Sequence, residues 1–172
     1  RGRPAACPML LPAPPGADRL CACGGPFGGG CCPGGGSNES GVGSGEDDHG
    51  HGTNVSGIVG AGNISGVVNP YRGVAPQVEF VSVKVLDSSN SFCCTSDVVA
   101  GLDWIVSDRP DVDVVNMSLG TWALFPGDCD GLSATTLAFA SAVNTLRARG
   151  VLTTVSSMNN GSGTSMGAPA CI

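Results

Sequence analysis

The stretch that decides the fold reads Asp47-Asp48-His49-Gly50-His51-Gly52-Thr53-Asn54-Val55-Ser56-Gly57. A loop of acidic residues and glycine passes at His51 into a segment with helical spacing. A helix N-terminus disfavours the charged imidazolium, and Gly50 and Gly52 let backbone and ligand approach closely. Because a catalytic imidazole needs a fixed direction, a neutral resting state and room for a substrate, His51 is a candidate general base. His49 is expected to be a solvated loop residue.

The segment after His51 is predicted to be a helix that packs tightly against a sheet. Its apolar residues Val55, Ile58 and Val59 recur at helical spacing. The other face of the helix carries small residues that allow close packing, namely Ser56, Gly57, Gly60 and Gly62.

The letters His-Gly-Thr followed by Val-Ser-Gly resemble the histidine motif of the subtilisin-like serine proteases, the subtilases. Three later segments resemble the same family in the same order: Gly73-Val74-Ala75-Pro76, Asn116-Met117-Ser118-Leu119-Gly120 and the strand that ends in Asn159-Asn160-Gly161. The resemblance implies an α/β fold with a doubly wound, mostly parallel sheet of the subtilisin type. It also implies a serine endopeptidase that hydrolyses peptide bonds by acyl transfer.

The same resemblance assigns roles to further residues. Asn159 would donate its side-chain amide to the tetrahedral oxyanion. Ser118, Leu119 and Gly120 would bind an extended peptide or protein substrate by strand addition. Met158 stands where the family has glycine, and it is expected to crowd the approach to the oxyanion hole.

Two interpretations of Ser165 are open. The segment Gly163-Thr164-Ser165-Met166-Gly167-Ala168-Pro169 resembles the subtilase nucleophile motif, in which the serine begins a long helix. However, the family places several elements between the oxyanion asparagine and the nucleophile, whereas Asn159 and Ser165 are almost adjacent. Pro169-Ala170-Cys171-Ile172 also resembles another segment of many subtilases. We therefore favour Ser165 as a look-alike, with an internal deletion that leaves it as the true serine as the alternative.

The first 45 residues differ in composition from residues 46–172. They hold nearly half of the 28 glycines and more than half of the 12 prolines. We therefore expect a disordered or irregular segment over 1–45, followed by a partial catalytic domain over 46–172. The aspartate that would orient His51 has no match in this segment, and Asp18 is better interpreted as a loop charge. The chain is shorter than the family's catalytic domains, so we expect a fragment that is inactive as the isolated chain.

Strands and helices alternate beyond residue 77, which predicts a parallel sheet with right-handed crossovers. The expected strands cover residues 78–86 and 112–120, and the block 150–162 resembles the family's strand that ends in Asn-Asn-Gly. The expected helices begin near Ser96-Asp97 and at Leu132, and Ser133 is the expected cap of the second.

The composition of the chain argues against some classes of binding partner. A net charge of −6 and a pI near 4.5 argue against nucleic acid. No apolar run is long enough to span a membrane. We expect a monomer that requires no cofactor. Calcium is an option in the loop that holds Asn63, although that loop contains no carboxylate.

Nine cysteines suit an oxidising compartment, so an extracellular or secretory location is expected. Their spacing does not match a zinc site. We expect Cys129 to bond to Cys93 or Cys94. A non-catalytic peptide-binding relative is the alternative function, and a structural or mistranslated product with a non-native segment 1–45 is a third possibility.

Overall fold

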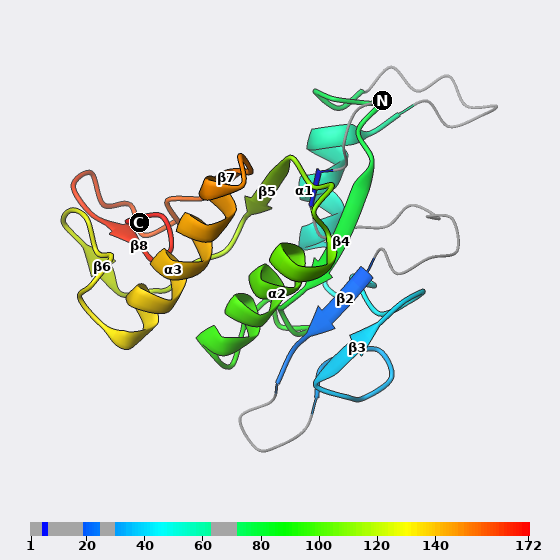
Figure 1. Cartoon of the computed structure of the whole chain (residues 1–172), viewed down its shortest axis with the longest axis horizontal. Helices are drawn as coiled ribbons and strands as arrows, with labels where there is room; N and C mark the ends of the chain where they lie inside the picture. Colours follow the sequence, from blue (N-terminus) through cyan, green and yellow to red (C-terminus); the bar gives the residue numbers. More distant parts are fainter. Residues whose placement is uncertain (1–4, 7–18, 25–29, 63–71) are drawn as a thin grey trace. The chain divides into compact units, whose positions relative to one another are not determined.

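A computed structural model describes residues 5–6, 19–24, 30–62 and 72–172 (Figure 1). The chain divides into two compact units, residues 1–101 and 102–172, and each is described by itself. Asp18 and the loop with Asn63 lie outside the described residues. None of the described helices is both long and apolar enough to cross a membrane.

The first unit contains β1 (Ala5–Ala6), β2 (Arg19–Ala22), β3 (Asn38–Ser40), α1 (His51–Gly60) and β4 (Phe80–Lys84). It also contains the first half of α2 (Thr95–Asp108). β4 pairs in parallel with both β1 and β2, and β2 pairs antiparallel with β3. The strand predicted over residues 78–86 is therefore present but shorter, and its parallel pairing follows the prediction.

Helices cover both faces of β4, because side chains alternate between the faces of a strand. Phe80 faces α1, since a Cβ added at Gly60 would lie 2.6 Å from the Phe80 ring. Val83 faces α2, since a Cβ added at Gly101 would lie 2.9 Å from its methyl group. This arrangement is the doubly wound pattern that the sequence predicts.

Helix α1 begins at His51, as predicted, and Gly50 before it has a φ of 93°. Its buried residues are Gly52, Ser56 and Gly60, while Ile58 is 63% exposed. The helix therefore packs through the face that carries its small residues. Its apolar residues lie mostly outside that contact. Glycine at position 60 allows the helix backbone to approach the side chains of Val78 and Phe80 closely.

Part of the segment 1–45 forms regular structure where the sequence analysis predicted none. Disulfides Cys21–Cys32 and Cys23–Cys31 link β2 and the residue just after it to the loop that precedes β3. The carboxylate of Glu39 accepts hydrogen bonds from the main-chain nitrogens of Gly34 and Gly36, each at 2.9 Å. The disulfides and hydrogen bonds stabilise this region together with a small buried cluster of Cys21, Cys23 and Cys32, and the sequence shows no regular hydrophobic spacing here.

The second unit contains the rest of α2, β5 (Val114–Met117), β6 (Leu124–Phe125), α3 (Ala134–Ala148), β7 (Leu152–Val155) and β8 (Met166–Gly167). β5 and β7 pair in parallel, with Val114 opposite Leu152 and Met117 opposite Val155. β6 and β8 pair antiparallel. The side chain of Ser133 caps α3 by accepting from the nitrogen of Thr136 at 3.1 Å, so the predicted cap is confirmed.

The expected pairing of Cys129 with Cys93 or Cys94 is wrong. Cys129 is bonded to Cys171, and this disulfide ties the loop before α3 to the turn after β8. Cys93 and Cys94 are exposed thiols whose sulfur atoms lie 2.6 Å apart. The hydrogen bond with Cys94 raises the pKa of Cys93 to about 11.

Candidate functional site

His51 is the first residue of α1, and its side chain is half-buried. The ring is therefore not sealed in apolar packing, which would have contradicted a catalytic role. The residues before it form a tight loop, Asp47 to Gly50, whose conformation sets where the helix begins.

Asp47 holds this loop against the first turn of α1. Its carboxylate accepts hydrogen bonds from the nitrogens of His49, Gly50 and Thr53, at 3.0, 2.8 and 2.7 Å, and from the Thr53 hydroxyl at 2.6 Å. Partial burial by itself would raise the pKa of Asp47, but these four hydrogen bonds outweigh it and hold the pKa well below its usual range. Asp47 therefore satisfies main-chain donors at the helix start while His51 remains half-exposed.

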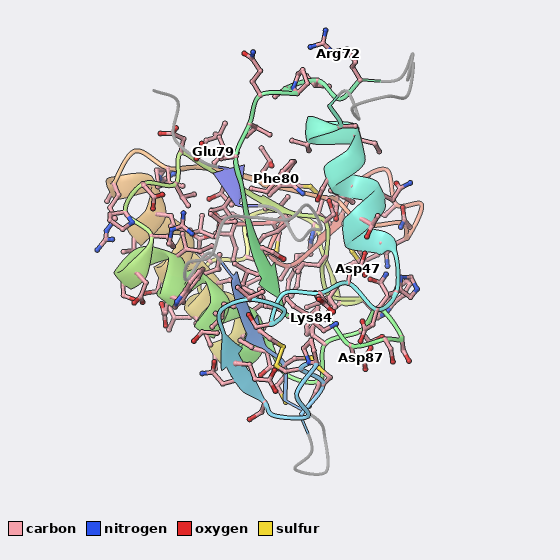
Figure 2. All side chains as sticks on the ribbon, turned by 90° about the vertical axis from the view of Figure 1, so that its right-hand side faces the viewer. Asp47, Arg72, Glu79, Phe80, Lys84 and Asp87 are labelled. Atoms are coloured by element: carbon pink, nitrogen blue, oxygen red, sulfur yellow. A yellow bond between two sulfur atoms is a disulfide. The ribbon has the colours of Figure 1, made fainter. Side chains whose placement is uncertain are left out.

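A second set of contacts fixes the same loop to β4. The ammonium of Lys84 lies 2.6 Å from the carboxylate of Asp48, and the Ser82 hydroxyl donates to the carbonyl of Gly45 at 2.9 Å. The Lys84 side chain is only 7% exposed, whereas that of Asp48 is 47% exposed. Figure 2 shows Asp47 and Lys84 at the end of this unit where α1 begins and β4 ends. The position of His51 thus depends on the carboxyl end of β4.

Sequence reasoning missed Asp47, Asp48 and Lys84 as supports of His51. The sequence holds a signal for Asp47 and for Lys84. Asp47 precedes Gly50 and Thr53 at the spacing of a loop that caps a helix, and Lys84 is a single charge in an apolar strand.

Asn159 follows β7 in the second unit and is exposed. The β5–β7 pairing extends one step beyond the strands, because the nitrogen of Ser156 donates to the carbonyl of Met117 at 3.1 Å. Met158 then adopts a φ of 70°, a left-handed conformation that is uncommon for a residue with a side chain. The recorded pairing with β5 ends at Ser156, and Asn159 directly follows the left-handed residue.

The segment Ser118-Leu119-Gly120 follows β5 in the same unit and is half-buried. The Ser156 hydroxyl donates to the carbonyl of Leu119 at 3.4 Å, and the nitrogen of Thr121 donates to the carbonyl of Ala168 at 2.8 Å. The segment therefore lies between the chain after β7 and the chain after β8. Within the described part of the chain, neither main-chain group of Gly120 has a hydrogen-bond partner.

Ser165 lies in an irregular stretch before β8. Its nitrogen donates to the Ser162 hydroxyl at 3.0 Å, and the next two residues pair with Phe125 and Leu124. A turn that contains Cys171 follows β8, so Ser165 precedes a short strand and not a helix.

The predicted residues are thus divided between the units. Asn159, Ser165 and the segment 118–120 belong to the second unit, and His51 belongs to the first. Among the residues that the structure describes, no three His, Cys, Asp or Glu side chains gather as a metal site would require.

The sequence profile of the subtilase family matches residues 35–172. The Minor extracellular protease Epr of Bacillus subtilis strain 168 is 36% identical over 127 residues, which are 73% of this chain and 17% of that protein. Subtilisin DY of Bacillus licheniformis is 38% identical over 130 residues, which are 75% of this chain and 41% of that protein. Among solved structures, Sphericase aligns with a TM-score of 0.58 at 27% identity, over 72% of this chain and 37% of that chain.

The chain therefore spans less than half the length of these relatives. The aligned residues form part of an α/β fold of the subtilisin type, with helices on both faces of β4. The profile match includes the histidine segment and the strands that follow it. This chain belongs to the subtilase family of serine proteases.

Proposed function

We propose that this chain supplies the histidine and the oxyanion-binding part of a serine endopeptidase that cleaves peptide bonds by acyl transfer. His51 takes the proton of an attacking serine hydroxyl, and Asn159 donates its amide to the oxyanion that forms. His51 then returns the proton to the leaving amine, and water hydrolyses the acyl-enzyme. The observation that carries this proposal is the family match over a segment in which His51 begins α1 and remains half-exposed.

The substrate in this proposal is an extended peptide that pairs with residues 118–120. The unpaired main-chain groups of Gly120 support it, because a peptide strand would satisfy both of them. Secretion is part of the proposal as well, since three disulfides favour an oxidising compartment.

Ser165 is not the nucleophile in this proposal. Its place before β8 supports this, because the family's serine begins a long helix. The 172 residues should then show little or no proteolysis by themselves.

A fluorophosphonate probe, which labels activated serines, tests the assignment of Ser165. We expect no labelling of the purified chain under conditions that label Subtilisin DY. Labelling at Ser165 that disappears in both Ser165→Ala and His51→Ala would contradict the proposal. It would favour the internal deletion, in which Ser165 is the true serine.

Peptide pairing is tested with two peptides that differ in the position of one N-methyl group. Successive N–H groups of an extended strand point in opposite directions. Methylation of the N–H that faces residue 120 should weaken binding about fivefold, since a lost main-chain hydrogen bond costs roughly 1 kcal/mol. Methylation of the next N–H is the control and should leave the affinity unchanged.

The alternative function is a subtilase relative that binds peptides without cleaving them. Peptide affinity that His51→Ala does not change, together with no turnover by the full-length product, would favour this alternative.

A further inference from the structure

The side chain of Met158 occupies the space between two glycines of the second unit. A Cβ added at Gly120 would lie 2.8 Å from its Cγ and 2.9 Å from its sulfur. A Cβ added at Gly167 would lie 3.4 Å from the same Cγ. The thioether therefore lies against the end of the segment 118–120 on one side and against β8 on the other.

Neither glycine contributes a side chain to this space. The Ser156 hydroxyl contacts the Met158 sulfur at 4.0 Å, and the carbonyl of Ala168 lies 3.2 Å from the Cβ position of Gly120. Gly120 and Gly167 border this opening with main-chain atoms alone, and a Cβ added at Gly167 would first meet the carbonyl oxygen of Thr121. Met158, which is half-buried, fills the opening from the end of β7.

The opening lies beside the main-chain groups of Gly120 that have no partner in the described chain. A peptide residue that pairs with Gly120 directs its side chain to one face of the new strand, as in any strand addition. A peptide side chain on the face where Met158 lies meets the Met158 thioether. It finds no empty pocket there. A large side chain could enter only if Met158 moved.

The backbone of Met158 limits such movement. Its φ of 70° belongs to a conformation that glycine adopts freely and that other residues rarely adopt. The residue is therefore held in an uncommon conformation in which its side chain fills the opening. Met158 is not among the buried hydrophobic residues of the described chain, and its recorded contacts include Gly120, Gly167 and the Ser156 hydroxyl.

We propose that Met158 determines specificity by closing the pocket beside Gly120, so that the peptide residue bound there must be glycine or alanine. This inference rests on the proposed function, because it assumes that a peptide pairs with residues 118–120.

The test uses the complete 172-residue chain and fluorescent peptides that differ at one position, with Gly, Ala, Leu or Phe there. Fluorescence anisotropy measures the affinity of each peptide for the native chain, for Met158→Gly and for Met158→Ala. Met166→Ala is the matched control, because Met166 lies in β8 and is 40% exposed. Circular dichroism and thermal unfolding verify that each variant is folded.

We expect the native chain to bind the Gly and Ala peptides at least about tenfold more tightly than the Phe peptide. Met158→Gly should remove or reverse this preference, Met158→Ala should have an intermediate effect, and Met166→Ala should have none. If all variants bind peptides with the native preference, the inference about Met158 is wrong and the proposed function stands. If neither the native chain nor any variant binds a peptide, the proposed strand pairing at residues 118–120 is wrong. The proposed role of Met158 is then wrong as well.

Discussion

The carboxylate of Asp47 accepts two hydrogen bonds from Thr53, one from its main-chain nitrogen at 2.7 Å and one from its hydroxyl at 2.6 Å. His51 lies between these two residues in the chain. The contact therefore closes a ring of seven residues around the candidate base and defines the first turn of α1.

Replacing Asp47 with alanine should destabilise the chain by about 1 kcal/mol, which is typical for the loss of a helix cap. Three main-chain donors and one hydroxyl lose their acceptor in this variant. Asp47→Asn should have a smaller effect, because the amide oxygen still accepts some of these bonds. Urea unfolding measures both, and Asp103→Ala on the exposed face of α2 is the control, with an expected change within about 0.5 kcal/mol. Equal stability of Asp47→Ala and the native chain would show that the loop holds without the carboxylate.

The contribution of Asp47 should depend on pH in a defined direction. Its pKa is lowered in the folded chain from an ordinary value near 3.9, so the folded state favours the charged form. The stabilisation is therefore fully present above about pH 5 and is lost as the pH falls below about 4 towards the folded pKa. The difference in unfolding free energy between the native chain and Asp47→Asn, measured by urea at several pH values from 3 to 7, should shrink at the acidic end. If this difference in unfolding free energy grows as the pH falls, the predicted direction of the pH dependence is wrong.

Lys84 and Asp48 should be coupled by roughly 1 kcal/mol in a double-mutant cycle. The Lys84 side chain is almost fully buried, whereas that of Asp48 is about half exposed, so solvent weakens the pair relative to a fully buried one. The cycle uses Lys84→Met, which preserves the packing of the side-chain stem, and Asp48→Asn. Repeating it in 1 M salt should reduce the coupling. A coupling energy of zero at low salt would mean that the 2.6 Å contact contributes nothing to stability.

The disulfide pattern makes a chemical prediction. Alkylation without reduction should modify Cys93 and Cys94, and peptide mass mapping should find Cys129 joined to Cys171. The bond closes a loop with a sequence separation of 42, so the double variant Cys129→Ala, Cys171→Ala should lose up to about 4 kcal/mol of stability. A cross-link from Cys129 to Cys93 or Cys94 would contradict the structure.

Local signals in the sequence were sufficient for several elements. The start of α1 at His51 and the Ser133 cap of α3 follow from a few neighbouring residues, and both are confirmed. The parallel pairing of β4 with β2 could not be read in the same way, because β2 has no hydrophobic period. It is fixed by register with residues 82–84, far along the chain.

The contrast between signals from neighbouring residues and contacts between distant residues also holds around the candidate site. The position of His51 in the chain is visible in its motif, but the residues that fix its loop are not. Lys84 reaches Asp48 across 36 positions, and Met158 reaches Gly120 across a similar distance, so only the folded chain brings them together. The roles of His51, Asn159 and Ser165 remain predictions, and the fluorophosphonate probe tests that of Ser165.

Two of the three glycines of α1, Gly57 and Gly60, should respond in opposite ways to alanine. A Cβ at Gly60 would lie 2.6 Å from the Phe80 ring and 2.7 Å from Val78, whereas a Cβ at Gly57 would meet nothing within 4 Å (Figure 2 labels Phe80). Gly57→Ala should therefore stabilise the chain by about 0.5–1 kcal/mol through helix propensity alone. Gly60→Ala should destabilise it by about 1–3 kcal/mol, because helix and strand must separate to admit the methyl group. Thermal unfolding of the two variants measures the contrast, and equal stabilisation by both would show that α1 does not pack on β4 through its small residues.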